Sequence, residues 1–525
     1  MAITRRGFLS TVSRAMSAGA LAAFAGPRLS LARGLLTEPK LDELIQRTLA
    51  AAKKAGATYA DVRIVRMRHE RLTAREDRIE SVTSTDEYGV GVRVIAGGAW
   101  GFSATPVVTA PEGERVAAAA VAVARANAAL LKRPVALAAE AAHVDVWQTP
   151  LVKDPFKIPL EDKADLLLEI NREAMRVPGV KFVNSWYAGV SEWKLLASTD
   201  GAYVEQEIVR LGPGYTVTAV DDRRGEFETR DHDLPPRQAG WEYVEGSTLR
   251  ADARRIAEEA VEKLRAPTVA PGKRDLILDP SNLWLTIHES IGHPTELDRA
   301  LGYEANFAGT SYATPDKRGK LRIGSPLLTF YADKTTPGGL ATCGYDDDGV
   351  ATQRWNLIEN GVLVGFQTTR EQAGWIGEAR SRGTCYADSY ASFPFQRMPN
   401  VSLAPAPQER SLEDLIAATD DGVVISGRGS WSIDHQRLNF QFSGQTYWEV
   451  KGGKRTRMLR DVAYQANTLE FWNSCDLLGG PRAWALGGSM SDGKGEPSQS
   501  NSVSHGCPPA RFRKVNILNT NRRGA

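Results

Sequence analysis

His288-Glu289-Ser290-Ile291-Gly292-His293 is the stretch on which the interpretation of this chain depends, because it places two of seven histidines on either side of a glutamate. Neutral imidazole nitrogens are good zinc ligands, and a carboxylate beside the metal can take a proton from water bound there. The apolar run Leu283–Ile287 comes directly before this stretch. The pattern therefore predicts zinc (Zn²⁺) held by His288 and His293, with Glu289 as the catalytic base. The alternative is a buried helix that carries a capping histidine.

The spacing of the two histidines differs from the common zinc-peptidase pattern H-E-x-x-H, in which positions i and i+4 share one helical face. Here the second histidine is at i+5, and five residues of an ideal α-helix rotate it by about 140° from the first. Gly292 permits a kink, and Pro294 stops an α-helix from continuing. We therefore expect a helix that breaks at Gly292 and turns His293 back toward His288.

Other motifs stand in a fixed order around this run. The run itself continues into Glu296 and Asp298. Two longer segments follow it, DDDGVATQRWNLIENGVLVGF at 346–366 and SYASFPFQRMPN at 389–400, and two shorter ones precede it, GATYAD at 56–61 and GVGVRV at 89–94. Together these segments resemble the TldD/PmbA family of metallopeptidases, specifically its TldD-type, metal-bearing members. The resemblance covers nearly the whole chain after residue 38.

The resemblance implies an α+β fold with two TldD-like domains, an α/β amino-terminal domain and a β-rich carboxy-terminal domain that holds the metal. The Pro-rich join at 266–272 is the expected boundary, which assigns residues 33–265 and 266–525 to the two domains. The resemblance also implies a zinc-dependent peptidase that hydrolyses peptides or unfolded protein segments inside an enclosed dimer chamber. We therefore expect either a homodimer or a heterodimer with a metal-less PmbA-type paralogue.

The third protein ligand is where this chain departs from its relatives. TldD-type proteins carry a cysteine in a Cys-Gly-Lys segment near the carboxy terminus, and the corresponding residues here are Asp492-Gly493-Lys494. Asp492 can bind zinc directly, because zinc accepts carboxylate oxygen. Alternatively, Cys507 of the segment 503–509, which also holds His505, replaces the lost thiolate. If neither residue binds, the metal site is weak or absent. The chain is then a non-catalytic peptide-binding or scaffold subunit, a decayed paralogue within a TldD/PmbA-type complex.

The amino terminus has the features of an export signal. Thr4-Arg5-Arg6-Gly7-Phe8-Leu9 is a twin-arginine pattern, a weakly apolar segment follows at 16–25, and Ser30-Leu31-Ala32 offers a small-x-small cleavage site. We therefore predict that residues 1–32 are a twin-arginine signal peptide and that the protein is periplasmic or otherwise extracytoplasmic. The alternative is a basic amphipathic helix that stays in the cytosol.

The composition is that of an ordinary globular enzyme. A net charge of +2, with no dense Lys/Arg block, argues against a nucleic-acid-binding surface. No run of eighteen apolar residues occurs after residue 40, so we expect no membrane span in the mature chain. The four cysteines contain no C-x-x-C pair, which excludes a disulfide scaffold and leaves one or two bridges open. Asp346-Asp347-Asp348-Gly349 lacks the spacing of a calcium loop and predicts a polar turn instead.

Periodic patterns predict the remaining elements. Helical periods are found at 41–55, 111–131, 160–177 and 248–265, and strand patterns at 61–67, 90–95, 181–187, 189–198, 202–209 and 214–220. Beyond residue 272 we expect mostly strands, interrupted by the metal-site helix and by a helix at 411–417.

Overall fold

The first described helix lies where the sequence predicted one. The computed structural model describes residues 39–232 and 234–521, and the predicted export signal at 1–32 lies outside them. Helix α2 (Pro39–Lys54) buries Leu44, Ile45 and Ala52, which lie on one helical face. This face packs against α3 (Ala110–Ala128), the predicted Ala-rich helix.

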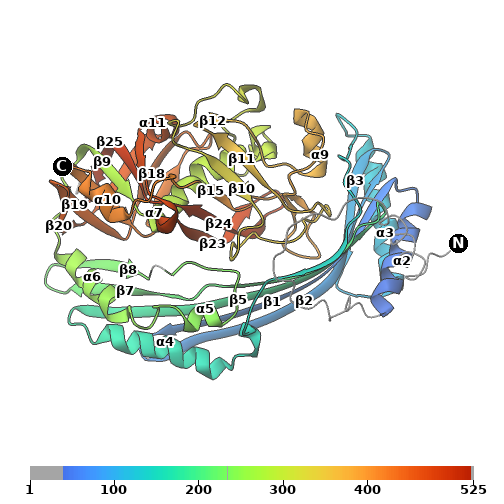
Figure 1. The fold of residues 1–525 in the computed structure, drawn as a ribbon. Coiled ribbons are helices and arrows are strands. Elements are labelled where there is room, and N and C mark those ends of the chain that lie inside the picture. Colours follow the sequence, from blue (N-terminus) through green and yellow to red (C-terminus); the bar gives the residue numbers. More distant parts are fainter. Residues whose placement is uncertain (1–38, 233, 522–525) are drawn as a thin grey trace. The chain divides into compact units, whose positions relative to one another are not determined.

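An eight-stranded sheet forms most of the first half of the chain (Figure 1). Its strands are β1 (Tyr59–Arg75), β2 (Arg78–Ala96), β3 (Ala99–Thr105), β4 (Val144–Gln148), β5 (Val180–Ser198), β6 (Tyr203–Leu211), β7 (Gly214–Asp221) and β8 (Glu226–Asp231). The order is β3-β2-β1-β5-β6-β4, with β7 pairing with β5 and β8 with β7. Only the β4–β6 pair among these is parallel.

The long strands of this sheet extend well beyond the predicted ones. β1 pairs with β5 without interruption from Asp61 to Arg75, although the sequence predicted a strand only to residue 67. The predicted break between 187 and 189 is also wrong, because Gly189 stays paired within β5. Polar and charged side chains on the exposed face hide the apolar alternation there, while backbone pairing continues.

Three further helices accompany this sheet. α4 (Leu160–Met175) buries Leu167, Ile170 and Ala174 and packs against β1 and β5, where the sequence predicted a helix. The short α5 (Glu242–Glu245) and then α6 (Ala253–Arg265) follow β8, and α6 packs on β7 and β8. The predicted helix at 248–265 therefore begins five residues later than expected.

Strands dominate the chain after residue 271, as predicted. A nine-stranded sheet contains β17 (Trp431–Ile433), β18 (Asn439–Ser443), β21 (Val462–Asn467), β25 (Ala510–Asn519), β9 (Gly272–Leu278), β16 (Asp421–Ser426), β19 (Thr446–Lys451) and β20 (Lys454–Leu459) in that order, and β22 (Cys475–Leu478) pairs with β25. A second sheet has the order β12 (Val362–Leu363), β11 (Arg354–Glu359), β10 (Phe330–Asp333) and β15 (Val401–Leu403). Two hairpin-like pairs are β13 (Cys385–Tyr386) with β14 (Phe395–Gln396) and β23 (Ala485–Lys494) with β24 (Gln499–Cys507).

Helix α7 (Pro280–Ile287) lies in the largest hydrophobic core, which positions the residues that follow it. Its side chains Leu283 and Ile287 are fully buried together with Leu276 of β9 and Phe512 of β25. The other helices in this half are α8 (Leu297–Ala300), α9 (Arg370–Ala373), α10 (Leu412–Ala417) and α11 (Thr468–Asn473). The strands before residue 266 pair only among themselves, as two separate domains would require. Strand pairing does not fix where a domain ends, so the boundary at 266–272 stays a prediction.

Two expectations on covalent and membrane features can be compared with the structure. All four cysteines are buried and free, so the structure contains no disulfide among them. No helix in the described part of the chain is long and apolar enough to cross a membrane.

Candidate metal centre

A π-helical turn resolves the i, i+5 spacing of the two histidines. α7 begins at Pro280, with the Asp279 carboxylate accepting the Ser281 N–H at 2.9 Å. Residues His288–Gly292 then form a π turn in which the His293 N–H donates to the His288 carbonyl. Because this turn closes its hydrogen bond over five residues, positions five apart lie one above the other. The predicted break at Gly292 is therefore wrong, since the backbone stays helical there and continues into a 3-10 turn at His293–Thr295. The expected approach of His293 to His288 is confirmed, because their ring centroids lie 4.6 Å apart.

Gly292 leaves room for a neighbouring side chain. Its backbone is right-handed helical, so no left-handed conformation requires a glycine here. A Cβ atom at this position would lie 2.7 Å from Sδ and 3.0 Å from Cε of Met398. A side chain at residue 292 would therefore require the buried Met398 side chain to move.

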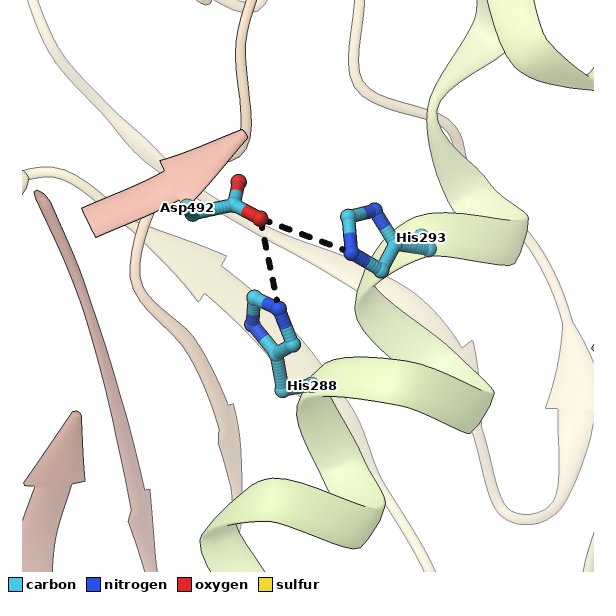
Figure 2. Close-up of side chains that lie close together, drawn as sticks. All are labelled: His288, His293 and Asp492. Atoms are coloured by element: carbon cyan, nitrogen blue, oxygen red, sulfur yellow. Dashed lines mark ion pairs between the residues drawn. The ribbon is translucent and has the colours of Figure 1, made fainter. Parts of the chain in front are cut away.

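His288, His293 and Asp492 converge on one point (Figure 2). The Asp492 Oδ1 atom lies 3.4 Å from His288 Nε2 and 3.5 Å from His293 Nε2. A tetrahedral zinc ion with bonds of about 2.0–2.1 Å holds neighbouring ligand atoms roughly 3.3–3.4 Å apart. Both separations match that value better than they match a direct N–H···O hydrogen bond of about 2.9 Å. The three donors therefore fit zinc, and all three residues are buried.

The proton positions on His288 follow from its contact with His505. His505 Nδ1 lies 2.8 Å from the Val401 carbonyl, which can only accept, so this nitrogen carries the proton. In neutral His505, Nε2 is then an acceptor, and it lies 2.8 Å from His288 Nδ1. His288 must therefore donate from Nδ1, and in the neutral ring this leaves the lone pair of Nε2 directed at Asp492. The His505 ring is itself stacked on Trp284, with an interplanar angle of 8°.

His293 is held in the same protonation state from another direction. Its Nδ1 lies 2.9 Å from Oε2 of Glu296, a carboxylate that accepts the proton. The other Glu296 oxygen accepts from the Lys494 ammonium at 3.2 Å, and Lys494 also donates to Asp298 at 2.9 Å. This gives Glu296, Asp298 and Lys494 of the sequence motifs a common role, because they orient a histidine whose Nε2 is free.

Asp492 presents one oxygen to the histidines and the other to an arginine. The buried Arg397 guanidinium lies 3.4 Å from Asp492 Oδ2 and also donates to the Asp492 carbonyl and to the Asn501 side chain. Oδ1 is thus left for the histidine side. Arg397 belongs to the 389–400 segment that was recognised only as a motif in the sequence.

The charges in this cluster favour an anion between two imidazoles. Burial alone would raise the pKa of Asp492, but the neighbouring His293, His288 and Arg397 side chains hold it well below its usual range. Burial lowers the pKa of His293 far below its ordinary value, and the positive charge of Arg437 lowers it further. His293 is therefore neutral, as metal binding requires.

The structure does not bring Cys507 to this point. Its sulfur lies 3.8 Å from the carbonyl of Pro280, at the start of α7. Eight residues separate Pro280 from His288, which is about 12 Å along a helix axis. Burial raises the pKa of the Cys507 thiol well above its usual range, which favours the protonated thiol at this position.

Glu289 forms a contact that the sequence did not suggest. Its carboxylate is largely buried and forms an ion pair with the Nη1 atom of Arg437, 148 residues further along the chain.

The loop Asp346–Gly349 forms the predicted polar turn, and each of its carboxylates is engaged by the protein. Asp346 accepts backbone N–H groups, and Asp347 and Asp348 form ion pairs with Lys194 and Arg93.

Comparison with known proteins agrees with the motifs. Relatives include a metalloprotease of Methanocaldococcus jannaschii, 26% identical over 84% of this chain and 93% of the relative. A zinc metalloprotease TldD homologue of Saccharolobus solfataricus is 24% identical over 89% of this chain and 98% of its own. Among solved structures, TldE of Thermococcus kodakarensis superposes with a TM-score of 0.63 at 17% identity, covering 90% of this chain and 100% of the other. The fold is therefore TldD/TldE-like.

Family models divide the chain into more domains than the two that the sequence motifs predicted. They match residues 60–127 as PmbA/TldA metallopeptidase domain 1, residues 153–266 as the central domain and residues 271–519 as the C-terminal domain. The expected two-domain description is thus not confirmed, because the models recognise three domains. Since the three follow one another in order from residue 60 to residue 519, the chain belongs to the PmbA/TldA family of metallopeptidases, the family that its motifs resemble.

Proposed function

We propose that this protein is a zinc-dependent peptidase that hydrolyses peptides or unfolded protein segments. One observation carries the proposal: His288 Nε2, His293 Nε2 and Asp492 Oδ1 meet at the separations of a zinc tetrahedron. Glu289 directly follows His288 in the chain. Three protein donors leave a fourth position open, as catalytic zinc sites require. The relative named zinc metalloprotease supports the choice of metal.

The protein residues have separate tasks in this mechanism. Zinc, when bound, would lower the pKa of a water molecule toward ~7 and polarise the peptide carbonyl. Glu289 would accept a proton from the attacking water and pass it to the leaving amine. His505 and Glu296 would keep the two imidazoles neutral at Nε2, and Arg397 would hold the second oxygen of Asp492 away from the histidines.

The surroundings of the reaction belong to the same proposal. From the family resemblance, we infer an enclosed dimer chamber built from two copies of this chain or from this chain and a PmbA-type paralogue. Such a chamber would admit extended peptides and exclude folded proteins.

Export by the twin-arginine route is a further part of the proposal. Arg5→Lys together with Arg6→Lys should trap the precursor in the cytoplasm, because the arginine pair is the feature that the export machinery reads. Fractionation of cells followed by immunoblotting measures this. Unchanged recovery of the variant from the periplasm would contradict the proposed location.

Metal content and the base variant test the enzymatic function. Purified protein should contain close to one zinc per chain by elemental analysis, whereas protein without zinc would favour the non-catalytic subunit. Glu289→Gln should retain zinc and the fold and lose peptide cleavage by roughly 10² or more, the usual contribution of a general base. Wild-type turnover by Glu289→Gln on a peptide that the parent cleaves would exclude the mechanism.

A further inference from the structure

Arg437 stands at the tip of the β17–β18 hairpin in a conformation that arginine rarely adopts. Its φ angle is +64°, in the left-handed region where a Cβ atom is unfavourable and glycine is not. The tip is fixed, because the Arg437 N–H donates to the Asp434 carbonyl at 2.9 Å and its own carbonyl accepts from the Thr468 hydroxyl at 2.7 Å. Glycine would satisfy this backbone without strain, so the turn itself does not call for an arginine.

The side chain of Arg437 makes few contacts that would stabilise the fold. Within residues 39–232 and 234–521, its guanidinium forms one ion pair, from Nη1 to Glu289 Oε2. Nε is buried without a partner, and no hydrogen bond from Nη2 is found in that part of the chain, although 12% of the side chain stays exposed. One terminal nitrogen thus holds Glu289, and the other is free.

The charge of Arg437 also acts on a second buried arginine. Burial lowers the pKa of Arg299, and the positive charge of Arg437 lowers it further. A residue in a strained backbone conformation whose side chain holds a buried carboxylate next to a candidate ligand is typical of a functional site.

We propose that Arg437 is a catalytic residue of the peptidase: Nη1 orients Glu289, and Nη2 donates to the substrate carbonyl oxygen as it gains negative charge. The inference rests on the proposed function. The water oxygen adds to the carbonyl carbon, its proton moves to Glu289, and the carbonyl π pair becomes an oxyanion held by Arg437. When the C–N bond breaks, the electron pair on oxygen re-forms the carbonyl, and Glu289 returns the proton to the leaving amine.

Arg437→Gly separates this role from a structural one, because glycine removes the side chain and also suits the backbone. We expect the variant to keep its zinc content and to melt no lower than the wild type. Its kcat/KM on a peptide that the parent cleaves should fall by about 10²–10³, the usual loss for one oxyanion donor, with the loss in kcat and not in KM. Added guanidinium ion should restore part of the activity.

The matched control is Arg428→Gln, which removes another positive charge near the site. Arg428 lies over the rings of Trp284 and Trp431, and no ion pair of its side chain is found in the described residues. This control should retain cleavage within about threefold, since its side chain forms no ion pair with Glu289 among the described residues, whereas that of Arg437 does.

A phosphonate peptide provides a readout other than turnover, because its tetrahedral anion mimics the charged intermediate. Its affinity for the zinc-loaded protein, measured by calorimetry, should fall in Arg437→Gly by the same factor as kcat/KM. Retained kcat in Arg437→Gly overturns the inference while leaving the proposed function intact. A lower melting temperature with no rescue by guanidinium assigns Arg437 a structural role and also overturns it. A wild-type protein that neither cleaves peptides nor binds the phosphonate contradicts the proposed function itself.

Discussion

Replacing His505 should weaken zinc binding without removing any ligand. In the structure His505 accepts the Nδ1 proton of His288 at 2.8 Å and thereby directs the Nε2 lone pair to the metal position. Leucine at 505 cannot accept, so the buried Nδ1–H of His288 loses its partner. An unsatisfied buried donor costs about 1–3 kcal/mol. Since about 1.4 kcal/mol corresponds to a tenfold change in a dissociation constant, His505→Leu should weaken zinc affinity roughly 5- to 150-fold.

A second variant distinguishes orientation from packing. His505→Gln also changes the ring stacked on Trp284, but its amide oxygen can still accept from His288. Zinc dissociation constants by competition with a chelator should therefore rank wild type tightest, His505→Gln next and His505→Leu weakest. The 10- to 100-fold range known for residues that orient metal ligands agrees with this estimate. If His505→Leu binds zinc within twofold of the wild type while its fold is intact, the assigned protonation state of His288 is refuted.

Two further predictions concern the third ligand and a buried charge. Asp492→Ala should lose zinc sharply while Cys507→Ser keeps it, because only Asp492 faces both histidines; equal zinc content in the two variants would contradict this choice. Burial alone would raise the pKa of Glu192, but its ion pairs with Lys194 and Arg210 outweigh burial and hold this pKa at about 2. The pKa of glutamate in an unfolded chain is about 4.3, so the difference corresponds to stabilisation of the fold on the order of 3 kcal/mol. A carboxylate whose pKa is lower in the folded state stabilises the fold at pH values above its pKa in the unfolded chain. This stabilisation is lost as the pH falls through its pKa in the folded protein. Glu192→Gln should therefore melt lower than the wild type at pH 7, and thermal scans should show that difference shrinking between about pH 4.3 and pH 2; a constant difference would exclude this charge effect.

The sequence predicted the chemistry of the site better than its backbone. His288 and His293 are recognisable because residue type and local spacing are both visible in six residues. The turn between them was predicted as a break, since a glycine followed by a proline usually ends a helix. A π turn differs from an α turn in which carbonyl accepts the His293 N–H, and no local residue pattern in this run specifies that choice. Long strands such as β1 were shortened for a related reason, because pairing with neighbours outweighs local polarity.

Glu296 lies only three residues from His293, but the contacts of His505 and Arg437 were not predictable, because each reaches the site from another part of the chain. His505 lies 217 residues after His288 and meets it only through the placement of β24 beside α7. Arg437 meets Glu289 from a hairpin whose own sequence resembles an ordinary turn. The motif thus shows which metal chemistry is available, whereas distant contacts decide which imidazole nitrogen is free and which carboxylate is paired. A second chain with the same His-Glu-His run but without an acceptor at position 505 would keep the ligands and lose the means of orienting His288. Without a cation at position 437 it would lose the partner of Glu289.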